Sequence, residues 1–393
     1  MQGSVRKKGN SWYYRYYVFI DGEKKQIERK GGNTKTEALA KLNEEMYKIN
    51  TGLFRPKETL FKDYLSMWLE DFVQPSKSAN TYYSYLGTIE KYIIPTLGHL
   101  PLCDIKVMHI ESFLSKLRKS KTLKGTLLTS TTIQKHYLVL NSSLNRAVKL
   151  QMLNDNPCKY VDTPKRKKFK ANILTLEEIQ KIYECLDSKK YDDYLFFLGM
   201  SLTTETGLRR GEMCGLQWSD IDFENKYLSC NTALIREKNR YCISALKTES
   251  SYRQLPLSDD MINLLKNHKK IQMENRLQYG ELYTKTNTFN GIDYNLIFTN
   301  EDGTYCIPSR FLQRLKRLCL HCKIDKNIRW HDLRHSNATI LLKSGISMKV
   351  IQERLGHSLM QTTSDIYAHV TKEMNTEATN IISNILYKKI REE

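Results

Sequence analysis

Residues 330–335 read "WHDLRH" and gather two imidazoles, one guanidinium and one carboxylate within one helical turn. His331 and Arg334 are three positions apart, so they lie on one face of a helix that we expect to begin at Trp330. The N-terminus of a helix carries partial positive charge and free N–H groups, and anions bind there. The stretch by itself is a weak signal, but it predicts an anion site at a helix start, with Asp332 holding the local geometry.

The overall charge of the chain indicates which anion to look for. Its 393 residues carry a formal net charge of +19, which suggests a polyanionic partner, nucleic acid first and anionic membrane second. No apolar run approaches the ~20 residues that span a bilayer, and the N-terminus lacks the apolar segment of a signal peptide. The nine cysteines are therefore expected to be reduced thiols in a cytoplasm.

Four residues imitate a zinc-finger pattern. Cys319 and Cys322 are followed by His331 and His335, but the spacer between the pairs holds eight residues, against the ~12–15 of the usual pattern. Both cysteines also recur at helical spacing among leucines. We favour two buried thiols on a helix and keep the zinc site as the alternative.

Residues 1–56 predict a small β-sheet with one helix. The stretch "SWYYRYYVFIDGEKKQIER" is typical of two strands around an "IDGE" turn, and "KTEALAKLNEEMYKI" of an amphipathic helix. A small basic sheet can lie in the major groove of DNA, so we predict a DNA-binding domain, with a solvated basic face as the alternative. The candidate DNA-binding residues in this domain are Arg6, Lys7, Lys8, Arg15, Lys24, Lys25 and Arg29.

The rest of the chain completes an α+β multidomain protein. Residues 57–163 are helical in pattern throughout and predict a bundle of four or five helices. Residues 164–172 predict a basic linker, whose candidate DNA contacts are Lys165, Arg166, Lys167 and Lys168. Residues 173–371 predict a mixed, mainly α domain with a three-stranded β-meander and helices to its end. Residues 372–393 predict a tail helix that docks on a neighbouring subunit, with packing on its own domain as the alternative.

Two further stretches place single side chains at helix ends. "TGLRRGE" ends one helix at Gly207 and begins another, on which Arg209 and Glu212 share a face. An inward arginine is costly unless it meets a carboxylate or a phosphate, so we expect an ion pair or an anion site there. In "ERLGHS", Gly356 ends a helix and presents His357 on a turn.

Five motifs fall in the order of a known family: "TGLRRGE", "ALKTESSYRQLPL", "HDLRH", "LGH" and "TTSDIYAHV". Together they resemble the tyrosine recombinases of the lambda-integrase type, most of all those of phages and conjugative transposons. The resemblance covers essentially the whole chain. It implies an arm-site DNA-binding domain, a core-site domain and a catalytic domain. The catalytic residues that it implies are Arg209, Lys247, His331, Arg334, His357 and Tyr367.

The resemblance also implies what each residue does. Tyr367 would attack a DNA phosphodiester, leaving a 3′-phosphotyrosyl link and a free 5′-hydroxyl, with no ATP consumed. Arg209 and Arg334 would bind the two non-bridging oxygens. The remaining three residues would act as proton handlers and phosphate ligands.

Of these three, His331 would be general base and phosphate ligand, and His357 would donate a hydrogen bond to the phosphate. Lys247 would protonate the leaving 5′-oxygen, with Lys238 as its rival. Preorganised cations can stabilise the transition state without a metal, so no cofactor is expected.

Two other functions remain open from the sequence. A type IB topoisomerase uses the same chemistry without joining two duplexes, and a DNA-binding protein with an inactive site would keep only the affinity. The recombinase reading further implies a synaptic tetramer on DNA and an accessory factor that bends DNA or sets direction. It places the protein in a bacterial cytoplasm.

Overall fold

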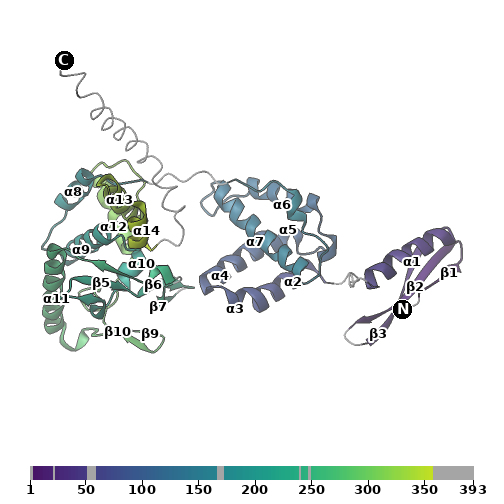
Figure 1. The fold of residues 1–393 in the computed structure, drawn as a ribbon, viewed down its shortest axis with the longest axis horizontal. Helices are drawn as coiled ribbons and strands as arrows, with labels where there is room; N and C mark the ends of the chain where they lie inside the picture. The colour runs from purple at the N-terminus through teal and green to yellow at the C-terminus, as the bar shows by residue number, and fades with distance from the viewer. Residues whose placement is uncertain are drawn as a thin grey trace, which may run out of the picture. The chain divides into compact units, whose positions relative to one another are not determined.

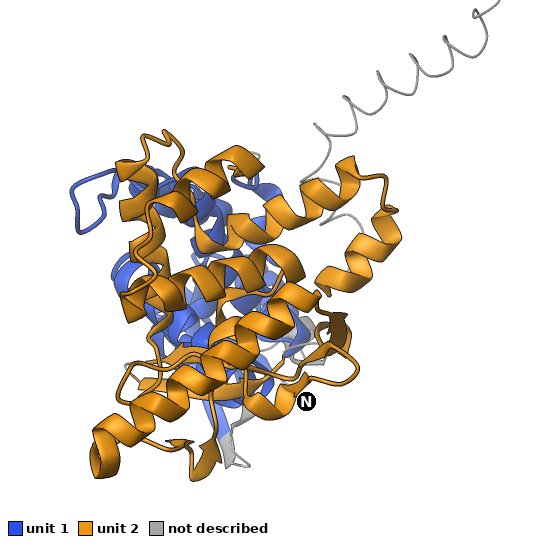
Figure 2. Ribbon diagram, turned by 90° about the vertical axis from the view of Figure 1, so that its left-hand side faces the viewer, with its two compact units in different colours: residues 1–168 blue, residues 169–393 orange. Residues whose placement is uncertain are grey.

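The computed structural model describes residues 3–20, 23–50, 59–165, 172–238, 240–246 and 249–356, the side chains of 18–20, 23, 24 and 47–50 excepted. The chain divides into an N-terminal unit, residues 1–168, and a C-terminal unit, residues 169–393 (Figure 2). Several predicted residues lie outside the described part of the chain. They are Lys247, His357, Tyr367, Arg166, Lys167, Lys168, the side chain of Lys24 and the tail 372–393.

The N-terminal unit begins with three antiparallel strands, one more than expected, and a helix (Figure 1). The strands are β1 (Ser4–Lys8), β2 (Ser11–Ile20) and β3 (Glu23–Gly32), and the helix is α1 (Lys35–Asn50). Tyr14, Tyr16 and Leu42 form the small core between sheet and helix. The β1 strand was missed because "SVRKK" has only one apolar residue. It is a strand because it pairs with β2, and its own residues have little strand propensity.

A helical bundle fills residues 59–165, and its four helical stretches agree with the four or five that we expected. Two of them are long helices interrupted by a π-helical turn, at Leu69–Val73 and at Ile89–Ile93. Each turn ends two residues before a proline, Pro75 or Pro95. A proline lacks an N–H and its ring clashes with the carbonyl four residues back, so the wider turn relieves that contact. The bundle helices are α2 (Phe61–Trp68), α3 (Gln74–Ser76), α4 (Ala79–Thr88), α5 (Ile94–Leu97), α6 (Val107–Lys119) and α7 (Ser130–Lys149).

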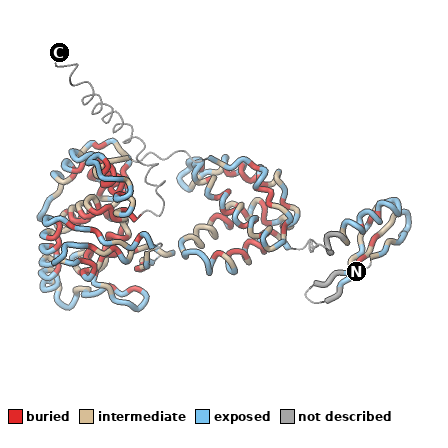
Figure 3. Tube along the Cα trace, viewed as in Figure 1, coloured by how far each residue is buried: buried red, intermediate tan, exposed pale blue. Residues whose placement is uncertain are grey.

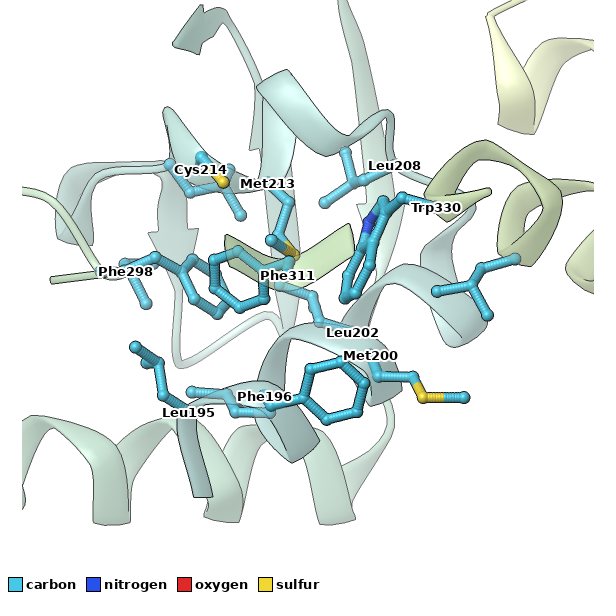
Figure 4. Close-up of a cluster of buried hydrophobic side chains, with 14 of the residues drawn as sticks. Leu195, Phe196, Met200, Leu202, Leu208, Met213, Cys214, Phe298, Phe311 and Trp330 are labelled. Carbon is cyan, nitrogen blue, oxygen red and sulfur yellow. The ribbon is translucent and has the colours of Figure 1, made fainter. Parts of the chain in front are cut away.

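The C-terminal unit packs helices around the buried helix α9 (Tyr191–Thr206). Figure 4 shows Phe196, Met200 and Leu202 of this helix beside Met213, Phe311 and Trp330 from other elements. Its other helices are α8 (Leu176–Glu184), α10 (Arg210–Cys214), α11 (Asp259–Tyr279), α12 (Pro308–His321), α13 (Trp330–Lys343) and α14 (Met348–Leu355). Figure 3 shows the buried residues gathered inside this unit, as they are inside the bundle.

The three expected strand segments are present, but they are shared between two sheets. The first segment is divided at Asn231 into β5 (Tyr227–Cys230) and β6 (Thr232–Glu237). β5 pairs with β4 (Ile221–Asp222) and β8 (Arg253–Pro256), whereas β6 pairs with β7 (Arg240–Ala245). The side chain of Asn231 donates a 3.0 Å hydrogen bond to Asp220 at the division. A second difference is the hairpin of β9 (Asn287–Phe289) and β10 (Ile292–Tyr294), where only helices were expected.

The zinc alternative is not supported. Within the described residues, which include all four candidate ligands, no group of three or more His, Cys, Asp or Glu side chains is arranged to hold a metal ion. Cys319 is buried in the core, as the thiol interpretation predicted. Cys322 is half-buried, and its sulfur lies 3.1 Å from that of Cys185. Of the helices that the structure describes, none combines the length and apolar character needed to cross a membrane.

Two buried histidines make the stability of the C-terminal unit depend on pH. Burial lowers the pKa of His268 and of His335 to about 4, while an unfolded histidine titrates near ~6.5. Between these values the unfolded chain binds more protons, so the free energy of unfolding falls as the pH is lowered from about 6.5 towards 4. At pH 5 each histidine accounts for about 1–2 kcal/mol of that loss.

We therefore expect the variant His268→Gln to lose less stability than the parent between pH 7 and pH 5. Glutamine cannot take up the proton, and its amide can still donate to the Ile297 carbonyl that His268 meets at 2.8 Å. Urea unfolding of the full chain at both pH values measures the difference, with the exposed His99→Gln as the control. Equal losses in His268→Gln and in the parent would contradict the assignment.

Candidate functional site

Helix α13 begins at Trp330, as the "WHDLRH" pattern predicted. Asp332 fixes this helix start, because its carboxylate accepts from the backbone N–H of Arg329 at 2.8 Å and from the Nη2 of Arg329 at 2.6 Å. Trp330 is buried and packs edge-on against Phe196 and Phe311. The first turn of α13 is therefore held from both sides, and the side chains that follow have defined positions.

Arg334 is completely buried, at 0% exposure. Its Nη1 donates to the carbonyl of Gly207 at 2.9 Å, and its Nη2 donates to the carbonyl of Leu355. Gly207 adopts a left-handed conformation that ends α9, with φ +71, and Leu355 is the last residue of α14. The last carbonyls of a helix have no partner within it and lie at its negative end, which is why they accept from a buried cation.

Arg209 is at the N-cap of α10 rather than within the helix, as the shared-face argument had supposed. The Glu212 carboxylate accepts from the backbone N–H of Arg209 at 2.9 Å and from the Nη1 of Arg209 at 2.5 Å. The Nη2 of Arg209 donates to the carbonyl of Gly356 at 3.2 Å. The expected contact with Glu212 is present, but the side chain is 37% exposed and not inward. Arg209 therefore keeps a surface open to a ligand.

The two arginines meet at one place although 125 positions separate them in the sequence. Arg334 holds the carbonyl of Leu355, and Arg209 holds the carbonyl of the next residue, Gly356. Two guanidinium groups, from α13 and from the start of α10, therefore converge on the C-terminal end of α14. The next residue in the chain, His357, lies outside the described residues.

His331 is exposed at the start of α13, one turn from Arg334. Desolvation of its ring, with the charges of His335, Arg334 and Arg209, lowers its pKa to about 4. His331 is therefore neutral at physiological pH, and it is a weaker base than a free imidazole as long as no anion is bound. Its ring stands edge-on to that of His335, 4.8 Å between centroids.

Arg253, on β8, contacts this cluster and was not predicted. Its Nη2 donates to Glu212 at 2.9 Å, and its side chain is 6% exposed. Arg253 lies in the motif "SYRQLPL", two positions before Leu255, so the alternation of a strand places both side chains on the same face. That pattern was the only sequence signal for Arg253, and it does not distinguish a buried arginine from a solvated one.

Four of the candidate DNA-binding residues of the front sheet, Arg6, Lys7, Lys8 and Lys25, are exposed, whereas Arg15 and Arg29 are partly buried. Arg6 and Lys8 both bind Glu28, at 2.5 and 2.6 Å, and these hydrogen bonds lower the pKa of Glu28 to about 2. Arg15 donates to Ser4 at 2.7 Å. The exposed cations that remain on this sheet include Lys7 and Lys25. Lys165, at the end of the described bundle, is exposed as well.

Three family models match successive parts of the chain. The model described as "Phage integrase family" matches residues 172–374. A model of the phage integrase N-terminal SAM-like domain matches residues 60–118, and an "Arm DNA-binding domain" matches residues 4–46.

Curated relatives match over nearly their whole length. The chain is 31% identical to "Tyrosine recombinase XerC-like" of Caldanaerobacter subterraneus subsp. tengcongensis, over 96% of this chain and 97% of that protein. It is 27% identical to the ICEBs1 integrase of Bacillus subtilis, over 98% and 100%.

Solved structures share the fold. The Tn1549 transposon integrase bound to transposon right end DNA superposes with a TM-score of 0.65 at 20% identity, covering 81% of this chain and 100% of that one. A lambda integrase tetramer bound to a Holliday junction gives a TM-score of 0.55 at 18% identity, covering 90% and 95%.

Proposed function

The chain belongs to the phage integrase family of tyrosine recombinases and is a site-specific DNA recombinase, and we propose that its phosphate site forms where Arg209 and Arg334 converge. The observation that carries this proposal is the pair of guanidiniums on the successive carbonyls of Leu355 and Gly356. His331 lies beside them, so two permanent cations and one neutral imidazole face the same small region.

The reaction splits strand exchange into two displacements. The phenolic oxygen of Tyr367 forms a bond to the scissile phosphorus, and the bond from phosphorus to the 5′-oxygen breaks. The product is a 3′-phosphotyrosyl link and a free 5′-hydroxyl. The 5′-hydroxyl of a second strand then attacks that link in the reverse sense. The phosphodiester energy is kept in the covalent link, so no nucleotide is consumed.

Arg209 and Arg334 would bind the two non-bridging oxygens of the phosphate. A guanidinium presents several donors in a planar fork, which suits two oxygens on one phosphorus. In the DNA-free protein these donors are held by main-chain carbonyls, that of Gly207 after α9 and those of Leu355 and Gly356 at the end of α14. A phosphate carries a full negative charge and would compete for them, drawing the two arginines onto the DNA.

Proton transfer falls to His331 and Lys247. A free tyrosine has a pKa of ~10, so its attack needs a base. His331 is neutral in the DNA-free protein, where its pKa is about 4. The negative charge of a bound phosphate would raise this pKa and so strengthen His331 as the base that accepts the phenolic proton. Lys247 would give a proton to the leaving 5′-oxygen, and His357 would donate a hydrogen bond to the phosphate. We assign the charge stabilisation to these preorganised groups, without a metal or cofactor.

The partners follow from the domains that the chain contains. We propose that residues 1–56 bind arm sites through the exposed cations of the front sheet, and that residues 57–163 with the basic linker bind core sites. The lambda integrase structure is a tetramer on a Holliday junction, and we propose the same assembly here, aided by an accessory factor that bends DNA or sets direction. The protein would act on DNA in a bacterial cytoplasm.

The tail, residues 372–393, would join neighbouring subunits. Its sequence places Ile381, Ile382, Ile385 and Leu386 on one stripe, too short a surface to form its own core. A mainly apolar groove on the C-terminal unit offers a receiving surface, lined in part by Leu176, Ile179, Tyr183, Ile340 and Leu341.

Two truncations test how the domains divide this work. A chain without residues 1–56 should lose arm-site binding but cleave a core site at close to the parent rate. A chain that ends at residue 371 should keep both binding activities while forming fewer tetramers on DNA. Gel-shift titration on separate arm and core duplexes, with cleavage of a nicked core substrate, measures both. Loss of core cleavage in the first truncation would refute the domain boundary, and normal tetramers in the second would refute the docking role.

A further inference from the structure

Three arginines hold three successive carbonyls at the end of α14. Arg253 donates from Nε to the carbonyl of residue 354 at 2.9 Å, Arg334 donates to that of residue 355, and Arg209 donates to that of residue 356 at 3.2 Å. The arginines come from β8, α13 and the start of α10. The backbone that leads into His357 is therefore fixed by three separate elements, and the proposed function uses only two of the three arginines.

Arg253 also shares the carboxylate that holds Arg209. Glu212 is 2% exposed, and its two oxygens accept from Arg253 Nη2 at 2.9 Å and from Arg209 Nη1 at 2.5 Å. Burial alone would raise the pKa of Glu212, but the charges of Arg253 and Arg209 and their hydrogen bonds lower it to about 2. Glu212 is therefore a permanent negative charge, a few ångströms behind the guanidinium that would bind the phosphate.

The charge balance of Arg209, Glu212 and Arg253, which share one carboxylate, decides how strongly Arg209 attracts an anion. Arg209 and Glu212 alone would form a neutral pair, which attracts a phosphate weakly. With Arg253 the cluster holds two positive charges and one negative, so one net positive charge remains. Arg253 itself is 6% exposed and its donors are used internally, one of them on the Ser251 carbonyl at 2.8 Å. It is therefore placed to act through Arg209 rather than on the DNA.

We propose that Arg253 is a positioning residue that offsets the charge of Glu212 and so leaves Arg209 positively charged towards the scissile phosphate. The same side chain fixes the end of α14 and the turn before β8, which follows the Lys247 segment in the chain. This inference rests on the proposed phosphate site of Arg209, Arg334 and His331, and it adds Arg253 as a residue that acts from behind that site.

The test is single-turnover cleavage of a nicked core-site duplex by the full chain, scored as covalent adduct. Arg253→Gln should cleave about 10- to 100-fold more slowly than the parent, a loss of the size found when a residue that orients a metal ligand is removed, while core-site affinity changes little. Arg253→Lys loses the fork but keeps the positive charge beside Glu212, and since the proposed role depends on that charge it should fall within about tenfold of the parent. Arg314→Gln removes another partly buried ion pair of the same unit, with Asp193, and should cleave normally.

The decisive variant is Glu212→Gln combined with Arg253→Gln. Removing both charges restores one net positive charge on Arg209, so the double variant should cleave severalfold faster than Arg253→Gln alone. A merely structural role predicts that the double variant is as slow as Arg253→Gln or slower, because two packing partners are lost. Thermal unfolding of each variant shows whether a loss of rate comes from a loss of fold.

The outcomes separate this inference from the proposed function. If the parent forms no adduct that depends on Tyr367, the proposed function fails. If the parent forms the adduct and Arg253→Gln cleaves at the parent rate, only the role of Arg253 is overturned. A double variant no faster than Arg253→Gln, or Arg253→Lys as slow as Arg253→Gln, would also overturn the charge-offset role. If Arg253→Gln does not fold, the comparison of Arg253→Lys with the parent decides: a loss beyond about tenfold, although the charge is kept, overturns the role.

Discussion

Replacing Tyr367 with phenylalanine is expected to abolish the covalent protein–DNA adduct, with cleavage reduced by about 10⁴-fold or more. The substitution removes the single oxygen that would attack phosphorus, and loss of a nucleophile costs orders of magnitude more than loss of a supporting group. The measurement uses a duplex nicked near the crossover site, so that the cut fragment diffuses away and the phosphotyrosyl adduct accumulates on a denaturing gel. Binding to the same duplex should remain close to that of the parent, because one hydroxyl among many contacts is lost.

Tyr252→Phe is the matched control for this experiment. Tyr252 is 46% exposed and lies next to Arg253, so it is another tyrosine close to the charged cluster. We expect its phenylalanine variant to form adduct normally. Adduct formation by Tyr367→Phe, or its disappearance in Tyr252→Phe, would place the nucleophile elsewhere in the chain. Joining of strands between two duplexes by the parent separates recombination from the relaxation that a type IB topoisomerase carries out.

Arg209→Lys is expected to bind DNA nearly as well as the parent and to cleave it about 10²- to 10³-fold more slowly, the cost of losing one preorganised donor to a developing charge. Lysine keeps the positive charge but lacks the planar fork. Arg209 uses that fork in the DNA-free protein, with Nη1 on Glu212 and Nη2 on the Gly356 carbonyl. An ammonium group is a compact point charge on a flexible stem, so it cannot present paired, coplanar donors to the Glu212 carboxylate and to the phosphate.

Arg210→Lys tests whether the effect belongs to position 209. Arg210 is the adjacent residue, is also an arginine and is only partly buried, and we assign it no role in the chemistry. The two variants should bind DNA with similar affinity in gel shifts, whereas Arg209→Lys should cleave much more slowly than Arg210→Lys in single-turnover experiments. Equal cleavage by Arg209→Lys and the parent would remove Arg209 from the phosphate site. A large loss of cleavage rate in Arg210→Lys would show that any Arg-to-Lys change at the start of α10 slows the reaction, so the effect would not be specific to Arg209.

Much of the fold was predictable because it depends on local patterns. The start of α13 at Trp330 and the end of α14 at Gly356 follow from residues within a few positions of each, so the sequence predicts them directly. The ordered motifs identify the family and its chemistry in the same way. The strand β1 and the division at Asn231 were missed, because strand pairing depends on partners elsewhere in the chain and not on the propensity of the strand itself.

The sequence by itself determined the family and the reaction class, and it predicts which residues carry out the chemistry, because a motif records the residue types that a phosphoryl transfer requires. Only the tertiary structure decided that Arg209 and Arg334 meet at the end of α14. Arg209 and the Gly356 carbonyl are 147 positions apart, and Arg253 and Glu212 are 41 apart. A buried arginine and a solvated one look alike in a periodic pattern. What distinguishes Arg253 is the carboxylate and the helix end that folding places around it, and the free energy of those contacts depends on distance in space rather than along the chain.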